Sequence, residues 1–264
     1  MMDLSECLVD DTRVSLVHET KYNKKRWLSS KPNLYVKKFN HAEFIGEELC
    51  AIRNIRCTHY FLVGLGLYQV NRTANYGNIK RMGYNYMIGS YDFKKSDRNY
   101  RYISDYNLGL SDDNLEAMLN QTVSFKNKME LRDDMFEMLA LDIYMGQVDR
   151  THSNFMFEED VEHNIRLAPL YDFEYSLKQN YLSRGMLSYG DLYAFRDIDE
   201  CKKFVSKYPS FKYVLESYLD VDLLDAIACA YRRRGMVVPD DKWEFYSEFE
   251  KDRDKSIQKV LKRN

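Results

Sequence analysis

One segment, residues 142–176, constrains this chain more than any other because it carries three oxygen-bearing side chains in a characteristic order. Asp149 and Asn154 lie five residues apart, and Asp172 follows further along, after a short apolar run. Carboxylate and amide oxygens are hard ligands of the kind that Mg²⁺ prefers, and Mg²⁺ is held by one or two carboxylates together with substrate phosphates. The segment therefore predicts a magnesium site if the three side chains converge.

A predicted β-hairpin between Asn154 and Asp172 supplies a reason for them to converge. Apolar strand-forming residues occupy 155–157 and 165–167, and the polar residues 158–160 between them are typical of a turn. A short hairpin returns the chain to its starting point. We therefore expect the two ends of the segment to lie side by side.

The same order of residues is the one that kinases use. In that arrangement the first Asp accepts the proton of the substrate hydroxyl, while the Asn and the second Asp hold metal. Asp and Asn are also common loop residues, but a hairpin and a second Asp at the expected place favour a phosphotransferase over an ordinary loop. Asp142 lies in the apolar stripe of a predicted helix, which indicates a buried support for the loop rather than a reacting group.

Composition limits the classes of protein that this chain can represent. It has 264 residues, 45% of them hydrophobic, and a formal net charge of −2, so it is long enough for a large core and has no strong field for nucleic acid or an acidic membrane. Its five cysteines are odd in number and show no CxxC spacing, which indicates reduced thiols and predicts a cytoplasmic protein. We find no secretory signal and no membrane span.

The first third of the sequence predicts a small β-rich lobe with one helix. Its apolar and β-branched runs are bounded by turn residues. Strands are expected at 13–18, 27–28, 34–39, 60–70 and 84–90, and a helix at 41–56 that begins after Asn40 with Glu43 three residues further on.

The strand at 34–39 and the helix at 41–56 predict an ion pair that could orient ATP. The strand ends in Lys37 and Lys38, and Glu48 lies on or beside the apolar stripe of the helix, where a charge needs a partner. A strand lysine paired with a helix glutamate is the device that kinases use to orient the α- and β-phosphates. We favour Lys37 over Lys38 and Glu48 over Glu47, although a surface pair made by Glu47 is the simpler alternative.

Two further stretches are candidates for nucleotide contacts. The loop at 20–25 contains Lys21, Lys24 and Lys25 but no glycine, so it is not a Walker loop, although its lysines could hold phosphates. A solvated basic turn is an equal alternative. We place the lobe boundary after the last predicted strand, and an adenine would lie there against Met87 and Ile88.

The remainder of the chain predicts a larger, mostly helical lobe. With the first lobe at 1–90 and the second at 91–264, the fold class is α+β, with a bilobal, protein-kinase-like arrangement. Helices are expected at 112–129 and 131–146, and residues 197–234 and 240–262 are expected to be mostly helical. The arginines at 232–234 are interpreted as a solvated helix end.

The residues quoted above resemble those of a known family. The stretch LDIYMGQVDRTHSNFMF followed by LAPLYDFEYSL is similar to the catalytic core of HipA-like kinases, within the protein-kinase-like superfamily. The earlier stretches KYNKKRWL, LYVKKF and GEELCA are similar to the amino-terminal lobe of that family. In pattern, the resemblance covers residues 15–180.

The resemblance implies a two-lobed protein serine/threonine kinase that uses ATP and Mg²⁺. Asp149 would be the base and Asn154 and Asp172 the metal ligands, while a strand lysine and Glu48 would orient the phosphates. Such kinases are often toxins of toxin–antitoxin systems, paired with a small antitoxin, and some are effectors. We also expect autophosphorylation on a hydroxyl near the basic loop, with Thr20, Ser29 and Ser30 as candidates.

Two positions depart from the pattern of the family. Thr151 stands where a His is common, two residues after the catalytic Asp, and Ser153 stands where a Lys often precedes the Asn. Without that lysine, the charge of the γ-phosphate would be neutralised by Mg²⁺, by Arg150 or by the loop lysines. The departures support one alternative, a pseudokinase or nucleotide-binding module without turnover. A small-molecule or lipid phosphotransferase is a second alternative that would use the same site.

Overall fold

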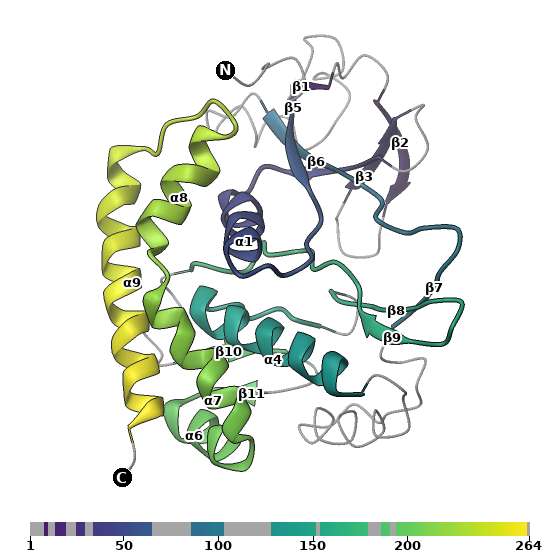
Figure 1. The fold of residues 1–264 in the computed structure, drawn as a ribbon. Coiled ribbons are helices and arrows are strands. Elements are labelled where there is room, and N and C mark those ends of the chain that lie inside the picture. The colour runs from purple at the N-terminus through teal and green to yellow at the C-terminus, as the bar shows by residue number, and fades with distance from the viewer. Residues whose placement is uncertain are drawn as a thin grey trace.

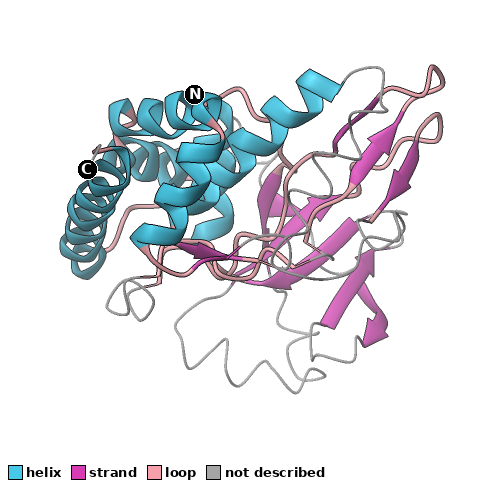
Figure 2. Ribbon diagram, turned by 90° about the horizontal axis from the view of Figure 1, so that it is seen from below, coloured by secondary structure: helices cyan, strands magenta, loops and turns pink. Residues whose placement is uncertain are grey.

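The computed structural model describes residues 8–9, 14–19, 25–29, 34–64, 86–102, 128–151, 154–178, 186–190 and 194–262. A β-sheet with one helix forms one part of the molecule, and a larger helical part lies against it (Figure 1). Seen from below, strands gather on one side and most helices on the other (Figure 2). The predicted α+β class, with a small β-rich part and a larger, mostly helical part, is confirmed, whereas the predicted division at residue 90 stays a prediction.

The large sheet has six strands in the order β1-β5-β6-β4-β3-β2. Neighbouring strands are antiparallel, except that β1 pairs with β5 in parallel. The strands are β1 (Leu8–Val9), β2 (Val14–Glu19), β3 (Lys25–Ser29), β4 (Leu34–Lys38), β5 (Tyr60–Gly64) and β6 (Tyr86–Tyr91). Each of the five predicted strands has a counterpart among the described residues, although residues 65–70 of the strand predicted at 60–70 lie outside them. Strand β1 was not predicted from the sequence.

The register of the central strands assigns the two strand lysines to opposite faces of the sheet. Lys37 is paired with Ile88, and Ile88 with Leu62, whereas Lys38 is paired with Met87. Directly opposite residues share a face, and alternate residues along a strand do so too. Position 37 therefore belongs to the face of the sheet that carries Leu62 and Ile88, both part of the hydrophobic core. Tyr60, two residues before Leu62 on β5, lies on the same face.

Helix α1 (His41–Ile52) begins where the sequence predicts but ends earlier. Asn40 is the N-cap, and its side chain accepts a hydrogen bond of 3.0 Å from the Ala42 backbone N–H. The prediction that the helix continues to residue 56 is wrong. Asn54 adopts a left-handed φ of 56°, a conformation that Asn tolerates better than most residues and that terminates a helix.

The predicted hairpin after the candidate catalytic loop is confirmed, with a shift of its first strand. The small sheet consists of β7 (Asn99–Arg101), β8 (Phe157–Glu159) and β9 (Ile165–Leu167), all antiparallel. The first hairpin strand was expected two residues earlier, at 155–157. The turn lies instead at 160–164, because Asp160 Oδ1 accepts 2.9 Å hydrogen bonds from the backbone N–H groups of Glu162 and Asn164.

Helix α4 (Lys128–Met145) runs through the middle of the molecule beneath α1 (Figure 1). The predicted break near residue 130 is wrong, since one helix continues across it; most of the helix expected at 112–129 lies outside the described residues. From residue 138 to residue 147 every residue is buried. The first turns of α4, by contrast, carry exposed residues such as Met129, Glu130 and Asp133, so complete burial is confined to the second half of the helix and the residues that follow it.

Four more α-helices, a 3₁₀ turn and two short strands complete the described part. They are β10 (Ser188–Tyr189), β11 (Ala194–Phe195), α6 (Ile198–Lys207), α7 (Pro209–Glu216), the 3₁₀ turn η6 (Ser217–Asp220), α8 (Leu223–Arg232) and α9 (Asp240–Leu261). The expected helical character of 197–234 and 240–262 is confirmed. None of the described helices is both long enough and apolar enough to cross a membrane.

The arginines at 232–234 are only in part the solvated helix end that the sequence indicated, because Arg232 and Arg233 are exposed and Arg234 is not. Arg234 is buried, forms an ion pair with Glu47 and lies with its guanidinium 4.2 Å from the centre of the Phe44 ring. Arg233 forms an ion pair of 3.2 Å with Glu48. Two basic residues that directly follow α8 thus bind two acidic residues of α1 and fix that helix against the helical part.

Candidate active site

The candidate catalytic loop begins where α4 ends at a glycine. Gly146 has a φ of 62°, and a Cβ at this position would lie 2.5 Å from the Arg253 guanidinium. Any other residue would therefore meet both backbone strain and a steric clash. Arg253 is buried on α9 and donates to the Leu187 carbonyl at 3.0 Å. Its positive charge lies at the carboxyl end of α4, where the helix dipole favours a cation.

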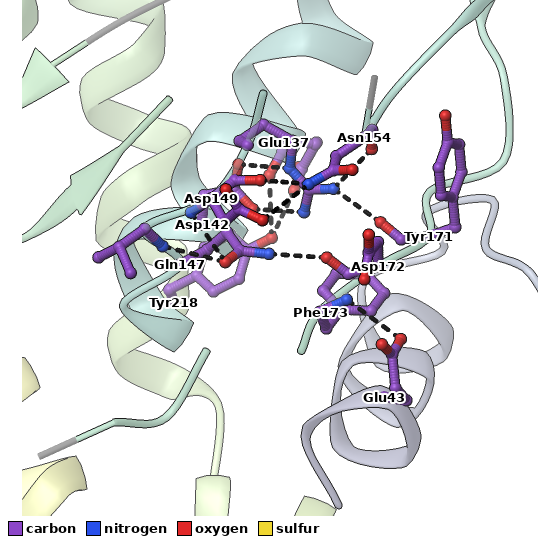
Figure 3. A network of polar contacts seen from close by, with 12 residues as sticks. Glu43, Glu137, Asp142, Gln147, Asp149, Asn154, Tyr171, Asp172, Phe173 and Tyr218 are labelled. Atoms are coloured by element: carbon purple, nitrogen blue, oxygen red, sulfur yellow. Dashed lines mark hydrogen bonds and ion pairs between the residues drawn. The ribbon is translucent and has the colours of Figure 1, made fainter. Parts of the chain in front are cut away.

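Gln147, the first loop residue after Gly146, joins the loop to the segment that carries Asp172. It is fully buried. Its side-chain oxygen accepts from the backbone N–H groups of Val148 at 3.0 Å and Asp149 at 3.2 Å, while its Nε2 donates to the Asp172 carbonyl at 2.9 Å (Figure 3). One side chain therefore fixes the two candidate aspartates relative to each other through their backbones.

Asp149 and Asn154 contact each other directly. Asn154 Nδ2 donates to the Asp149 backbone carbonyl and, at 3.3 Å, to its carboxylate Oδ2. A further hydrogen bond of 2.8 Å from the Asn154 backbone N–H to the Thr151 carbonyl closes the loop. Asn154 is buried and Asp149 is half-buried, so the amide holds a carboxylate that remains partly accessible.

Arg150 is a buried residue that holds the loop in place through hydrogen bonds to its backbone and to Asp142. It is fully buried, and its guanidinium makes a bidentate ion pair with Asp142 at 2.7 and 3.0 Å. Its remaining terminal nitrogen donates to the carbonyls of Asn154 at 3.0 Å and Tyr171 at 2.8 Å. The prediction that Asp142 is a buried support is confirmed. The suggestion that Arg150 neutralises a γ-phosphate is wrong, because its guanidinium is committed to these internal partners.

Asp172 adopts an unusual backbone conformation at the other side of the site. Its φ of 62° lies in the left-handed region, which is uncommon outside glycine and is concentrated at functional positions. The Asp172 backbone N–H donates to the Tyr60 hydroxyl oxygen at 3.0 Å. Burial, followed by the charge of Glu43, raises the pKa of Tyr60 well above its ordinary value, so this hydroxyl stays protonated. Strand β5 thereby supports the backbone that presents Asp172.

Glu43 is a site residue that the sequence analysis missed. It is fully buried on α1, and its Oε2 accepts a 3.1 Å hydrogen bond from the Phe173 N–H, next to Asp172. Five residues along a helix correspond to a rotation of about 140°. Glu48 consequently faces a different direction, towards Arg233. Its place directly before the apolar Phe44 and Ile45 was the available signal, but the sequence analysis attributed Glu43 to helix capping.

Comparison with solved structures shows a similar fold at low sequence identity. The Helicobacter pylori proinflammatory kinase CtkA matches with a TM-score of 0.62 and 14% identity, over 96% of each chain. HipA of Shewanella oneidensis, solved with HipB and operator DNA, matches with a TM-score of 0.59 and 13% identity, over 100% of this chain and 70% of that one. This chain has the HipA-like kinase fold. No family model and no curated protein sequence matches it.

Within this HipA-like fold, the candidate phosphate-orienting residues are only partly described. The side chains of Lys25, Lys37, Lys38 and Met87 lie outside the described residues, as does all of Lys21. Ile88 is buried in the core, and the partner of Glu48 among the described residues is Arg233. The predicted ATP contacts of these residues and the predicted pair of a strand lysine with Glu48 therefore stay predictions.

The described donor set fits a magnesium ion bound together with phosphates. Asp149, Asn154 and Asp172 belong to the network of Figure 3, in which Asn154 contacts the Asp149 carboxylate and Gln147 bonds the Asp172 backbone carbonyl. Their side chains offer carboxylate and amide oxygens, which suit Mg²⁺. No group of three or more His, Cys, Asp or Glu side chains that could hold a metal exists in the described part of the chain. A site of two carboxylates and an amide, completed by substrate oxygens, is the type that Mg²⁺ uses in phosphotransferases.

Proposed function

We propose that this protein is an ATP- and Mg²⁺-dependent protein serine/threonine kinase of the HipA-like type. One observation carries the proposal: Gln147 and Arg150 each bond both the Asp149–Asn154 loop and the segment that presents Asp172. Two buried side chains thereby hold the segments in a fixed relation, as a site that takes residues from both segments requires. The HipA-like fold supports the same conclusion.

In the proposed reaction Asp149 accepts the proton of the substrate hydroxyl as that oxygen attacks the γ-phosphate. The contact with Asn154 Nδ2 orients the Asp149 carboxylate for this transfer. Mg²⁺, when bound by Asn154 and Asp172, would offset the negative charge on the phosphate oxygens. The chain's contribution is mainly positioning, because phosphoryl transfer requires alignment more than covalent chemistry.

For the ATP phosphates we propose Lys37 as the orienting lysine, with Lys38 as the alternative. Position 37 shares a sheet face with Tyr60, whose hydroxyl contacts the Asp172 backbone. A lysine on that face would be directed to the same side of the sheet as Asp172. Glu43 is a better-placed carboxylate for such a lysine than Glu48, since Glu43 contacts the residue next to Asp172.

The remaining contacts and partners extend this proposal. Lys21 and Lys25 are proposed to reach phosphates, and the strand that carries Met87 and Ile88 to border the adenine. The substrate is proposed to be a protein hydroxyl, and the chain's own Thr20, Ser29 and Ser30 are candidates for autophosphorylation. A small antitoxin partner and a cytoplasmic location are further proposals, the first supported by the HipB-bound HipA neighbour.

A pseudokinase is the second candidate function, and a specific observation favours it. Ser153 replaces a lysine common in the family, and Arg150, the adjacent cation, is fully buried. The γ-phosphate charge would then depend on Mg²⁺ and on the strand or loop lysines alone. Retention of Asp149, Asn154 and Asp172 argues for the active enzyme, since a module that only binds nucleotide needs no catalytic base.

Incubation of the purified protein with Mg-ATP and a cell lysate separates these functions. A kinase yields new phosphoserine or phosphothreonine on lysate proteins or on the chain itself, detected by mass spectrometry. A nucleotide-binding module raises its unfolding temperature with Mg-ATP yet produces no phosphorylated product. Phosphate recovered only on small molecules or lipids indicates the third type of phosphotransferase. Either of the last two results would overturn the protein-kinase proposal.

A further inference from the structure

A groove on the helical part of the molecule lies between residues 219–225 and helix α9, outside the candidate active site. Helices α8 and α9 run side by side along one edge of the molecule (Figure 1). The residues that line the groove come from η6, from the start of α8 and from α9. We call it the α8–α9 groove. Its volume of about 540 Å³ lies within the range of about 300–1,000 Å³ that is usual for binding pockets.

Part of the groove surface is apolar and only half-covered by the protein. Four apolar side chains line it, and each packs against the hydrophobic core while remaining half-buried: Leu219, Val221, Leu224 and Trp243. Apolar surface that is left in contact with water gains free energy when a partner covers it. Tryptophan in particular is enriched among the residues that contribute most to protein interfaces. The apolar part of the groove therefore suits an apolar side chain of a partner.

The rest of the groove surface is acidic. No basic residue lines it, whereas five carboxylates do: Asp220, Asp222, Asp225, Glu250 and Asp254. None of the five forms an ion pair within the described part of the chain. Glu250 and Asp254 lie four residues apart on α9, a spacing at which like charges repel. Burial, followed by the charge of Glu250, raises the pKa of Asp254, and no basic residue opposes that rise.

The distribution of the carboxylates favours several cations over a single ion. Asp222 is the N-cap of α8 and accepts from the Asp225 N–H at 2.8 Å, while Glu250 Oε1 accepts from the Leu223 N–H at 2.8 Å. In the described part of the chain, no three acidic, histidine or cysteine side chains converge closely enough to hold one metal ion. Positive charges spaced along an extended chain therefore match the groove better than a metal does.

We propose that the α8–α9 groove is a docking site for a basic peptide segment of a partner protein, in which an apolar residue is flanked by lysines or arginines. The apolar residue covers Trp243 and its apolar neighbours, and the flanking cations pair with the carboxylates of the groove. A lysine or arginine over the face of a tryptophan ring adds a cation–π contact. Complementary charge of this kind selects the partner and accelerates its encounter with the groove.

The groove is attached to the helix that leads into the candidate catalytic loop. The hydroxyl of Tyr144 on α4 donates to the Val221 carbonyl at 2.7 Å. Burial, followed by the charges of Glu250, Asp254 and other groove carboxylates, raises the pKa of Tyr144, so this hydroxyl stays protonated and remains a donor. A docked segment therefore rests on a turn that is fixed to α4. The proposal is independent of the proposed kinase chemistry, since the groove residues lie outside the network of Asp149.

The test is a titration of a short fluorescent peptide, with one leucine between lysines and arginines, with the nucleotide-free protein, followed by anisotropy. A groove variant combines Asp220→Asn with Asp254→Asn, neither of which caps α8. A matched control variant combines Glu248→Gln with Asp252→Asn: it removes the same charge from exposed positions of α9 that do not line the groove. Thermal unfolding checks that each variant is folded. A second peptide carries serine in place of the leucine.

We expect saturable binding of the leucine peptide that weakens about tenfold in the groove variant, because two ion pairs at the surface are lost. The control variant should bind the peptide as the wild type does. The peptide should also change the tryptophan emission of the protein, and Trp243→Phe should abolish that change. Absence of saturable binding, equal affinity of the groove and control variants, or equally tight binding of the serine peptide overturns the proposal.

Discussion

Single buried residues that contact the candidate catalytic loop determine the conformation of the proposed site. Arg150 and Asp142 are both fully buried and meet in a two-point ion pair. A pair of this kind adds little net stability, since both charges lose their hydration. The ion pair instead fixes the orientation of the Arg150 guanidinium. Its remaining donors then hold the backbone carbonyls of Asn154 and Tyr171 in place. Replacement of one partner leaves the other charge buried and uncompensated.

We predict that Asp142→Asn lowers the free energy of unfolding by about 3–5 kcal/mol, the usual cost of breaking a buried ion pair from one side. Urea denaturation followed by circular dichroism measures the change. Asp133→Asn on the same helix is the control, because the Asp133 side chain is 66% exposed and its 4.0 Å pair with Arg132 is a surface contact. That control should change stability by less than about 0.5 kcal/mol. Equal effects of the two substitutions would contradict the assignment.

At the scale of elements, α1 is the helix that sets the position of the Asp172 segment. Its N-cap Asn40 donates to the Glu174 carbonyl at 2.8 Å, and Glu43 accepts from the Phe173 N–H at 3.1 Å. Gly46 allows the buried Phe173 ring to approach so closely that a Cβ would lie 2.5 Å from it. Three positions spaced along the start of α1 thus contact the two residues that directly follow Asp172.

We predict that Gly46→Ala destabilises the protein and lowers phosphate transfer. Replacement of glycine by alanine inside a helix normally adds about 1 kcal/mol of stability. Here the added methyl meets the Phe173 ring, and overpacking of this kind costs about 1–3 kcal/mol. Urea denaturation and a transfer assay measure the two effects.

A second substitution that makes room is the control for this prediction. Phe173→Leu in the Gly46→Ala background should recover part of the lost stability, because the smaller side chain leaves space for the methyl group. If Gly46→Ala alone is more stable than the wild type, then α1 does not pack on Phe173 as described.

At the scale of the whole molecule, a histidine at the start of α1 links the two parts. The His41 ring stacks on Tyr231 of α8, with centroids 5.0 Å apart, and meets the edge of Phe39. Burial, with the charge of Lys242 as a second cause, lowers the pKa of His41 from 6.5 to about 4. The unfolded chain therefore binds this proton more readily than the folded protein does.

We predict that this difference lowers the free energy of unfolding as the pH falls from about 6.5 to about 4, by about 3 kcal/mol at most. Stability is retained above that window, where His41 is neutral in both states. His41→Phe should flatten the dependence while keeping the aromatic contacts. Chemical denaturation at several pH values measures it.

His59 supplies a control because its pKa is shifted in the opposite direction to that of His41. A hydrogen bond to Glu47 raises the pKa of His59, so its contribution is present at low pH and is lost as the pH rises through the raised value. His59→Gln should therefore leave the loss of stability between pH 6.5 and 4 in place. An unchanged pH profile in His41→Phe would contradict the assignment.

The sequence predicted the fold class, the strands and the hairpin because these depend on local patterns. The closeness of the Asp149–Asn154 loop to the Asp172 segment could also be predicted, since a short hairpin brings its ends together, whereas the roles of Asp149, Asn154 and Asp172 stay predictions. Glu43, Gln147 and Tyr60 were not, because their roles follow from contacts between segments distant in sequence. Burial of a charge such as Arg150 likewise becomes visible only once α4 and the segment that ends at Tyr171 are packed around it.

The most direct test of the central claim is transfer of labelled phosphate from Mg-ATP by the wild type, Asp149→Ala and Asp172→Ala. We predict that each variant loses about 10²–10⁴-fold in rate, the typical contribution of a catalytic base, while circular dichroism shows an intact fold. Asp133→Ala, an exposed carboxylate on α4, should retain the wild-type rate. Transfer by both Asp149→Ala and Asp172→Ala at the wild-type rate would contradict the account.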